Sequence, residues 1–337
     1  MNRPDIYIVL GTGSIARRHI GNFKSLFSEV QVGCISASGR AFDAAEVGAD
    51  IVFESLDQAI AAKPALAVVA SPSPFHVEQA VRLLRAGIPT LIEKPLSDSL
   101  ASLSDAKKVF EENKDIVDVA YNLRYMPSAI KFKSLLDSNI LGRLTRVAVE
   151  VGQYLPDWRP GSDYRKNVSA RKELGGGVLL ELSHELDYLN WIFGQFDTAY
   201  CTASNSGRLE VDVEDSACAI LEHKDGFVAV LQMDFLQRTP TRTCKVVGEL
   251  GTLVWDLLSN SLTFHGASGD KEVLFSESGY NRNAMYLDEI NHFVKVAAGE
   301  LAPMVDISQA FKVMGLIEAL KKSAETKQVV KVGDFQL

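Results

Sequence analysis

Lys94 is the side chain in this sequence best suited to act on a bound ligand. It follows the apolar pair Leu91–Ile92 and the acid Glu93, and Pro95 comes next. Proline ends a strand because it cannot donate a ladder hydrogen bond, and it favours extended geometry in the residue before it. We therefore expect Lys94 at the carboxyl end of a strand, the edge of an open α/β sheet at which ligands bind. On these residues alone, a surface Glu–Lys pair is the simpler interpretation.

His184 is the second residue whose type and surroundings suit proton transfer. It lies in a stretch between Gly177 and Gly194 whose apolar residues follow helical spacing,. Glu181 precedes it by three residues and Asp187 follows it by three. His184 and Glu181 can then share one face of a helix and relay a proton. A single helical histidine is more often structural, so the catalytic interpretation depends on the presence of Lys94 elsewhere in the chain.

A glycine-rich turn near the start of the chain predicts dinucleotide binding. The apolar run Ile6–Leu10 predicts a buried strand, and Gly11-Thr12-Gly13-Ser14-Ile15-Ala16 follows it, before an amphipathic helix toward Phe27,. In this context Gly11 permits the tight turn, Gly13 lets a pyrophosphate approach the backbone, and Ala16 lets the helix pack on the strand. We expect residues 11–15 to bind the cofactor at the helix N-terminus. His19 is expected on the face of this helix and not as a ligand.

The second strand, expected over Val30–Ile35, ends in residues that favour NADP(H). A site that prefers NAD usually carries an acid at this distance from the glycines, which binds the ribose 2′-hydroxyl. Here the chain has Ser36, Ser38 and Arg40 instead, and two hydroxyls with a guanidinium suit a 2′-phosphate. We expect NADP(H) to be preferred, with NAD(H) as the second option. The alternative is a polar loop in which Asp43 reaches the ribose.

Polar residues also follow the later strands of the predicted first sheet, which are expected at Leu66–Ala70 and Val117–Tyr121. Because the carboxyl ends of parallel strands share one edge, we expect several of these residues near the nicotinamide. They are Ser71, Pro72, His76, Glu93, Lys94 and Asn122. For His76, capping of the helix expected over Val77–Ala86 is an equally good interpretation.

From about residue 144 the pattern changes to long alternating segments. Six strands are expected: Leu144–Gly152, Ala199–Asn205, Ser216–Glu222, Phe227–Phe235, Arg242–Val247 and Thr252–Asp256. Such alternation with short turns is typical of an antiparallel sheet with one free face. The expected fold class is α/β, with a Rossmann NAD(P)-binding domain over residues 1–122 and an α+β domain with a large, mostly antiparallel open sheet over 123–337. We expect the free face to join copies of the chain in a homodimer or homotetramer.

The loop between the first of these strands and the glycines is long and rich in aromatic and charged residues. Loops of this length are usually functional or disordered, and this one is too aromatic to be disordered. Aromatic faces and arginine forks suit a polyhydroxylated ring and its anionic groups. The residues assigned to the substrate are Tyr154, Trp158, Tyr164 and Arg165 of this loop, together with Arg124, Tyr125, Asp187 and Tyr286. The alternative is a surface loop packed on itself.

Three further elements are expected near the end of the chain. They are a helix within Tyr280–Ala298, a helix over Ile307–Lys322 and a strand within Gln328–Val332. We expect them to pack beside the nucleotide domain.

Composition and charge exclude several classes of protein. The apolar fraction of 47% and the charged fraction of 23% are typical of a globular protein,. The net charge of −8 argues against a nucleic-acid surface,. The four cysteines are dispersed without metal-ligand spacing, which predicts buried thiols in a reducing compartment and no metal site,. No apolar run is long enough to span a bilayer, and Met1–Asp5 leads directly into a strand, so we expect a cytoplasmic protein without a signal peptide,.

Together these motifs resemble the glucose-fructose oxidoreductase / inositol dehydrogenase / rhizopine-catabolism (Gfo/Idh/MocA) family over nearly the whole chain. The motifs are the Gly11–Ala16 turn, Glu93-Lys94-Pro95, the triple glycine followed by His184 and Asp187, and Asn283–Glu289 at the start of a C-terminal helix. The resemblance implies a Rossmann domain joined to an α/β domain with an open sheet, and a Lys–Pro bond that is often cis. It also implies that Lys94 and His184 act on a sugar or cyclitol hydroxyl.

One position departs from the family pattern. Many relatives have an aspartate four residues before the histidine, where this chain has Leu180. Alignment from the glycines would instead place Glu181 on that aspartate, so the role of Glu181 as a relay is open.

The predicted function is that of an NAD(P)-dependent oxidoreductase, which transfers a hydride to or from a secondary alcohol or ketone of a sugar, cyclitol or nucleotide-sugar. The cofactor takes the hydride, Lys94 stabilises charge on the oxygen, and His184 shuttles the proton. Arg124 and the arginines of the loop favour a sugar with a carboxylate or a nucleotide diphosphate. Two alternatives stay open: a non-catalytic sensor of NAD(P)H and a ligand, and a reductase of a non-sugar ligand such as a linear tetrapyrrole or an imine.

Overall fold

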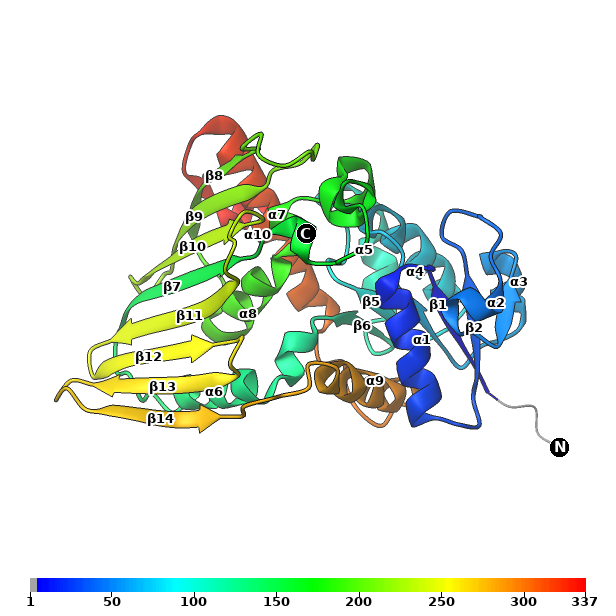
Figure 1. Cartoon of the computed structure of the whole chain (residues 1–337), viewed down its shortest axis with the longest axis horizontal. Coiled ribbons are helices and arrows are strands. Elements are labelled where there is room, and N and C mark those ends of the chain that lie inside the picture. Colours follow the sequence, from blue (N-terminus) through cyan, green and yellow to red (C-terminus); the bar gives the residue numbers. More distant parts are fainter. Residues whose placement is uncertain (1–4) are drawn as a thin grey trace. The chain divides into compact units, whose positions relative to one another are not determined.

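The computed structural model describes residues 5–337, which form two units (Figure 1). The first unit contains the chain up to Asn122, with Arg282–Phe311 and Leu337, and the second contains Leu123–Asn281 and Lys312–Gln336. The expected lack of a signal peptide rests on the first five residues, of which residues 1–4 lie outside the described part. Within residues 5–337, no helix has the length and apolarity needed to cross a membrane.

The first unit is built on a parallel sheet of six strands in the order β3-β2-β1-β4-β5-β6. The strands are β1 Ile6–Leu10, β2 Gln31–Ile35, β3 Ile51–Phe53, β4 Leu66–Val69, β5 Thr90–Glu93 and β6 Val117–Ala120. β1, β4, β5 and β6 are buried along their whole length, because helices cover both faces of such a sheet. The expected Rossmann sheet is confirmed. Its strand order reverses between β1 and β4, the point at which nucleotides bind in this fold.

Six helices belong to the first unit among the described residues. They are α1 Ser14–Leu26, α2 Ala44–Val47, α3 Leu56–Ala61, α4 His76–Arg85, α5 Leu100–Glu112 and α9 Ala284–Ala297. α9 packs on α1, since its Ile290 and Phe293 share a buried core with Ile20 and Phe23. A chain segment far from the N-terminus in sequence thus completes the nucleotide unit.

The second unit contains a sheet of nine strands in the order β14-β13-β12-β11-β7-β10-β9-β8-β15. The strands are β7 Leu144–Gly152, β8 Thr198–Ser204, β9 Ser216–Glu222, β10 Val228–Asp234, β11 Thr241–Gly248, β12 Gly251–Asp256, β13 Ser261–Gly266, β14 Lys271–Ser276 and β15 Val330–Lys331. The sheet is mostly antiparallel, as expected, but β7 and β10 pair in parallel. β13 and β14 were not expected.

Helices cover one face of this sheet (Figure 1). They are α6 Pro127–Asp137, α7 Val178–Glu181, α8 Ser183–Phe193 and most of α10 Ile307–Thr326. Trp255 of β12 donates to Ser128 of α6 at 2.8 Å, and the backbone N–H of Cys201 donates to Ser323 of α10 at 2.8 Å. The expectation that all the C-terminal elements pack beside the first unit was therefore wrong for most of α10 and for β15, which pairs with β8.

The other face of the sheet is open within the described residues. Buried and exposed side chains alternate along β9, where Ile220 is exposed. Cys218 lies on this face and is exposed, whereas the other three cysteines are buried. The expectation of four buried thiols was therefore wrong for Cys218, because its strand position alternates away from the core.

The remaining short helices are of the 3-10 type. They are η1 Ser73–Phe75, η2 Asn122–Tyr125, η3 Leu155–Asp157, η4 Tyr164–Lys166, η5 Val168–Ala170, η6 Lys172–Leu174 and η7 Val332–Phe335. Four of them lie in the long loop after β7, which therefore has more local structure than its sequence suggests.

Candidate functional site

The turn after β1 has the backbone geometry that a dinucleotide phosphate requires. Gly11 has a φ of 122°, and a Cβ there would lie 2.5 Å from the carbonyl oxygen of Ala70, so a side chain has no room beside β4. A Cβ at Gly13 would meet no atom of the described residues within 4 Å. The backbone at Gly13 is therefore open to a ligand among the described residues, and Gly13, as the N-cap residue, has no side chain that could bond the N-terminal amides of α1. These amides and the helix dipole suit the phosphates of a dinucleotide.

The loop after β2 presents the side chains expected to discriminate between NAD and NADP. The hydroxyls of Ser36 and Ser38 lie 3.3 Å apart. The guanidinium of Arg40 is 3.7 Å from the carboxylate of Glu46, and the Arg40 side chain is 64% exposed. Asp43, the alternative ribose ligand, caps α2 by accepting from the N–H of Ala45 at 3.1 Å. Its carboxylate is thus already engaged in local structure.

Lys94 follows β5 at the carboxyl edge of this sheet and is partly buried. The Lys94–Pro95 peptide bond is cis, as the family resemblance implied. Glu93, expected at the cofactor, is buried instead: its Oε1 accepts from Nε2 of His19 at 2.7 Å. Its Oε2 accepts from the backbone N–H of Lys94 at 3.2 Å. The carboxylate is therefore occupied within the protein.

His76 was also expected to contact the cofactor, but its ring is only 1% exposed. Nδ1 lies 2.9 Å from the carbonyl oxygen of Pro95, and Nε2 lies 2.7 Å from that of Ser71. Burial lowers the pKa of His76, and the two carbonyl acceptors oppose that shift. Both ring nitrogens thus face backbone carbonyl oxygens, and the expected contact of His76 with the cofactor stays a prediction. Ser71 itself is buried, and its hydroxyl donates to Gln79 at 2.7 Å.

His184 belongs to the second unit, and the single helix expected over this stretch is broken. α7 ends at Glu181 and α8 begins at Ser183, with Leu182 between them at φ −97° and ψ 27°. Glu181 and His184 therefore lie on two different helices on either side of this break, and the role of Glu181 as a relay stays a prediction. His184 is partly exposed in the first turn of α8.

The start of α7 is fixed by a close approach between Gly177 and Glu214. Gly177 has a φ of 105°, and a Cβ there would lie 2.4 Å from Oε1 of Glu214. The same carboxylate oxygen accepts from the N–H of Leu179 at 3.2 Å. Burial raises the pKa of Glu214. The triple glycine thus permits the close backbone approach at the start of α7, the helix that precedes the one that carries His184.

Two buried ion pairs hold α8 in the second unit. Asp187 accepts from Arg124 at 2.6 and 3.0 Å, and Glu185 accepts from Arg242 at 2.7 and 3.1 Å. Burial raises the pKa of Asp187, and the Arg124 guanidinium opposes the shift. Arg124 and Asp187, both assigned to the substrate from the sequence, are therefore neutralised by each other.

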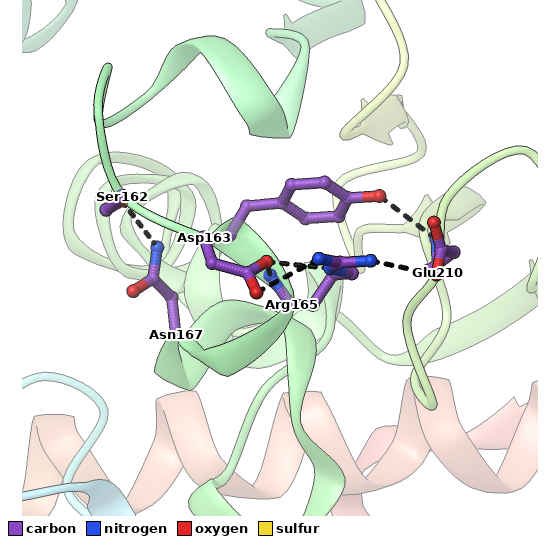
Figure 2. A network of polar contacts seen from close by, with 6 residues as sticks. Ser162, Asp163, Arg165, Asn167 and Glu210 are labelled. Atoms are coloured by element: carbon purple, nitrogen blue, oxygen red, sulfur yellow. Dashed lines mark hydrogen bonds and ion pairs between the residues drawn. The ribbon is translucent and has the colours of Figure 1, made fainter.

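The long loop after β7 makes most of its polar contacts within its own unit. Arg165 donates to Asp163 at 2.7 Å and to Glu210 at 3.2 Å (Figure 2). The hydroxyl of Tyr164 accepts from the backbone N–H of Glu210 at 3.2 Å. These contacts favour the alternative of a loop packed on itself for Tyr164 and Arg165.

The aromatic residues at the start of this loop also have partners. The guanidinium carbon of Arg238 lies 3.6 Å from the ring centroid of Tyr154. Trp158 donates to the carbonyl oxygen of Gln153 at 3.1 Å. Tyr125 is 9% exposed.

Tyr286 belongs to the first unit, at the start of α9, and Arg18 lies 4.5 Å from its ring centroid. Its pKa is raised by burial, with a smaller contribution from the charge of Glu93.

Two buried titratable residues of the first unit were not assigned to the site from the sequence. His19 is fully buried, and Ala16, Ile20 and Phe23 share its buried face of α1; this spacing was visible in the sequence and predicts a buried position. Glu289 of α9 is 2% exposed, and neither carboxylate oxygen has a hydrogen-bond partner among the described residues. Burial, followed by the charges of Glu93 and Asp118, raises the pKa of Glu289 well above its ordinary value. In residues 5–337 no cluster of ligating side chains could hold a metal ion.

Known proteins resemble this chain in both units. Residues 6–121 match the model of the oxidoreductase family with an NAD-binding Rossmann fold, and residues 130–254 match the GFO/IDH/MocA C-terminal domain. An inositol 2-dehydrogenase 2 from Saccharopolyspora erythraea is 28% identical over 256 residues, which is 73% of this chain and 71% of the relative.

Two solved structures share the fold at lower sequence identity. A levoglucosan dehydrogenase in complex with NADH and levoglucosan is 17% identical, with a TM-score of 0.84 over 98% of this chain and 99% of that one. The WlbA dehydrogenase from Bordetella pertussis, in complex with NADH and UDP-GlcNAcA, is 20% identical, with a TM-score of 0.80 over 98% and 99% of the two chains. With its open phosphate turn, its Glu93-Lys94-Pro95 segment and family matches across both units, this chain belongs to the Gfo/Idh/MocA family of NAD-binding oxidoreductases.

Proposed function

We propose that the protein is an NAD(P)-dependent dehydrogenase that oxidises a secondary hydroxyl of a neutral sugar or cyclitol, or reduces the corresponding ketone. The observation that carries this proposal is the joint placement of two features at one sheet edge. These are the open backbone at Gly13 and Lys94 at the end of β5. The names of the inositol and levoglucosan dehydrogenases among the similar proteins support the substrate class.

The proposed roles follow from what the reaction needs. The bound nicotinamide supplies hydride transfer. Lys94 donates a hydrogen bond to the reacting oxygen and stabilises its developing negative charge. His184 accepts the hydroxyl proton during oxidation and returns it during reduction, with Glu181 as the proposed relay.

A neutral substrate is favoured by the partners of the two arginines that had suggested an anion. Arg124 is buried in its ion pair with Asp187, and Arg165 is bonded to Asp163 and Glu210. Binding a carboxylate or diphosphate through either arginine would require one of these pairs to open. Opening the buried Arg124–Asp187 pair is costly because one charge loses its partner, whereas the Arg165 pairs are exposed and contribute little,. The aromatic residues Tyr154 and Trp158 are still proposed to contact the substrate ring.

For the cofactor, we propose a preference for NADP(H) over NAD(H). Arg40 is largely exposed, and its distance of 3.7 Å from Glu46 is longer than a hydrogen bond,. A bidentate contact with a 2′-phosphate would be stronger than this surface pair. Ser36 and Ser38 offer two further hydroxyls on the same loop.

We also propose that the open face of the sheet in the second unit joins two or more copies of the chain. Ile220 of β9 and Val273 of β14 are large apolar residues exposed on these strands. Sedimentation of the purified chain tests the proposal: a monomer at all concentrations would contradict it.

A substrate panel tests the proposed function. The purified protein is loaded with NADPH or NADH, and fluorescence is followed after addition of the ketone form of an inositol, of levoglucosan or of a UDP-sugar acid. We expect loss of the reduced-cofactor signal with a neutral ketone and little with the UDP-sugar acid. A protein that binds the cofactor and a ligand without any loss of signal would be a sensor. Oxidation of the cofactor by an imine or tetrapyrrole alone would favour the non-sugar reductase.

A further inference from the structure

We infer that two buried histidines, His19 and His76, are positioning residues for Lys94, one acting through Glu93 and the other through Pro95. The inference rests on the proposed function, which assigns Lys94 to the reaction. All five residues belong to the first unit. The histidines hold the residues immediately before and after Lys94.

His19 reaches Lys94 through a single carboxylate. Its Nε2 donates to Oε1 of Glu93 at 2.7 Å, and Oε2 of Glu93 accepts from the backbone N–H of Lys94 at 3.2 Å. His19 is fully buried on α1, and Glu93 is 7% exposed. The carboxylate therefore ties the backbone of Lys94 to the helix whose N-terminus forms the phosphate turn.

His76 holds the next residue along the chain. Its ring lies between the carbonyl oxygens of Pro95 at 2.9 Å and Ser71 at 2.7 Å. Ser71 follows β4, and Pro95 follows β5 by two residues. His76 thus connects the exits of two neighbouring strands, one of which carries Lys94.

The contacts of His19 and His76 are expected to add little to the free energy of unfolding, which favours a role in positioning Lys94. A buried ionisable pair such as His19–Glu93 contributes little net stability compared with apolar residues of the same volume, because desolvation offsets the attraction. A buried ring with carbonyls at both nitrogens likewise costs desolvation at two atoms. Such contacts instead fix the position of the backbone on either side of Lys94. This matters because a shift of about 1 Å in a reacting group can lower a rate by about 100-fold.

Substitution of each histidine by Asn and by Gln tests whether the hydrogen bond itself matters. Both replacements remove the ring, but they place the amide nitrogen at different positions. The amide nitrogen of Asn occupies roughly the place of Nδ1 of histidine, and that of Gln roughly the place of Nε2. Both ring nitrogens of His76 face carbonyl oxygens, and a neutral imidazole carries a single N–H, so positioning of Pro95 requires the tautomer that is protonated on Nδ1,. His76→Asn should keep this donation to Pro95, whereas His76→Gln should lose it and place its amide nitrogen near Ser71. At position 19 the order reverses, so His19→Gln should keep the bond to Glu93 and His19→Asn should lose it.

We expect His76→Asn and His19→Gln to retain kcat within about threefold of the parent. His76→Gln and His19→Asn should lower kcat by about 10- to 100-fold with smaller changes in KM and in the cofactor Kd. Rates are measured with the ketone of the panel that turns over fastest. Thr90→Val is the matched control, since it removes a buried hydrogen bond of 2.8 Å at the other end of β5. It should leave kcat near that of the parent.

A second measurement distinguishes failure of this inference from failure of the proposed function. In a Lys94→Met background, the damaging substitutions should have no further effect on the residual rate, because they act through Lys94. Equal losses for both amides at each position, or full additivity with Lys94→Met, would overturn the inference. If Lys94→Met is fully active, the proposed function fails. Hydrogen exchange at the backbone amides of residues 94–98 then tests, independently of activity, whether the histidines hold this segment in place. Faster exchange there in His76→Gln but not in His76→Asn supports it, and equal exchange in both contradicts it.

Discussion

Arg124 and Asp187 form a two-point ion pair in the interior of the second unit, with both side chains 1% exposed. Arg124 lies in η2, and Asp187 lies in α8 three residues after His184. The pair therefore fixes the helix that carries the proposed proton shuttle. Both residues were also predicted from the sequence to contact the substrate, and that role stays a prediction.

Removing one partner of this pair should unfold the protein more readily. We expect Asp187→Leu to lower the free energy of unfolding by about 3–5 kcal/mol, because Arg124 would be left buried without its counter-charge. The double variant Arg124→Met/Asp187→Leu should recover most of the loss. Urea unfolding measures both. Lys133→Met is the control, since it breaks the exposed Lys133–Asp137 pair and should cost less than about 1 kcal/mol,. A stable single variant would show that the buried pair does not hold α8.

Glu289 should make stability fall as the pH rises. Its pKa in the folded protein is well above the ordinary value of 4.5, so its protonated form favours folding. That contribution is complete below about pH 4.5 and is lost as the pH rises through the raised pKa. Between about pH 5 and pH 8, the free energy of unfolding should therefore fall less in Glu289→Gln than in the parent. The two decreases should differ by on the order of 1 kcal/mol or more. Parallel pH profiles of the unfolding free energy would contradict the assignment.

The two glycines of the phosphate turn should respond differently to a side chain. Gly13→Val adds atoms where the described residues leave open space, so folding should be little changed. Its dinucleotide Kd should rise by about tenfold or more, since the pyrophosphate must approach that backbone. Gly11→Ala forces a Cβ against Ala70 at a φ of 122° and should lower stability by about 1–3 kcal/mol. Fluorescence titration and thermal unfolding distinguish the two effects; normal cofactor binding by Gly13→Val would argue against this phosphate site.

Arg40 should set the preference between the two cofactors. Arg40→Ala removes the guanidinium proposed to bind the 2′-phosphate, so the Kd for NADPH should rise by about tenfold while that for NADH changes little. Glu46→Gln is the matched control, since it removes the charge that faces Arg40 while the amide oxygen can still accept from the N–H of Asp43 at the start of α2. An unchanged ratio of the two dissociation constants in Arg40→Ala would remove the proposed preference.

The sequence predicted those elements well whose short-range residue pattern reflects both backbone geometry and burial. Gly11, Gly13 and the apolar run before them predicted a turn whose geometry the structure confirms. β7 and β9 were predicted with their observed bounds, because alternation on a half-buried sheet is strong,. β13 and β14 were missed because their exposed and partly buried residues do not alternate cleanly.

The hydrogen-bond and ion-pair partners of the site residues could not be predicted from the sequence, because they come from distant parts of the chain. His19 and Glu93 are 74 residues apart, and Arg124 and Asp187 are 63 apart. Residue type alone does not distinguish an arginine that binds a substrate from one neutralised by an internal acid. The break at Leu182 was missed because the leucine spacing continues through it.

We propose above all that Lys94 assists hydride transfer between the bound nicotinamide and the carbon that bears the reacting oxygen of a sugar or cyclitol. The most direct test is the rate of ketone-dependent NAD(P)H oxidation by Lys94→Met, with cofactor binding measured on the same sample. We predict a loss of kcat of at least about 100-fold with a cofactor Kd close to that of the parent. Full turnover by Lys94→Met on a ketone that the parent reduces would contradict it.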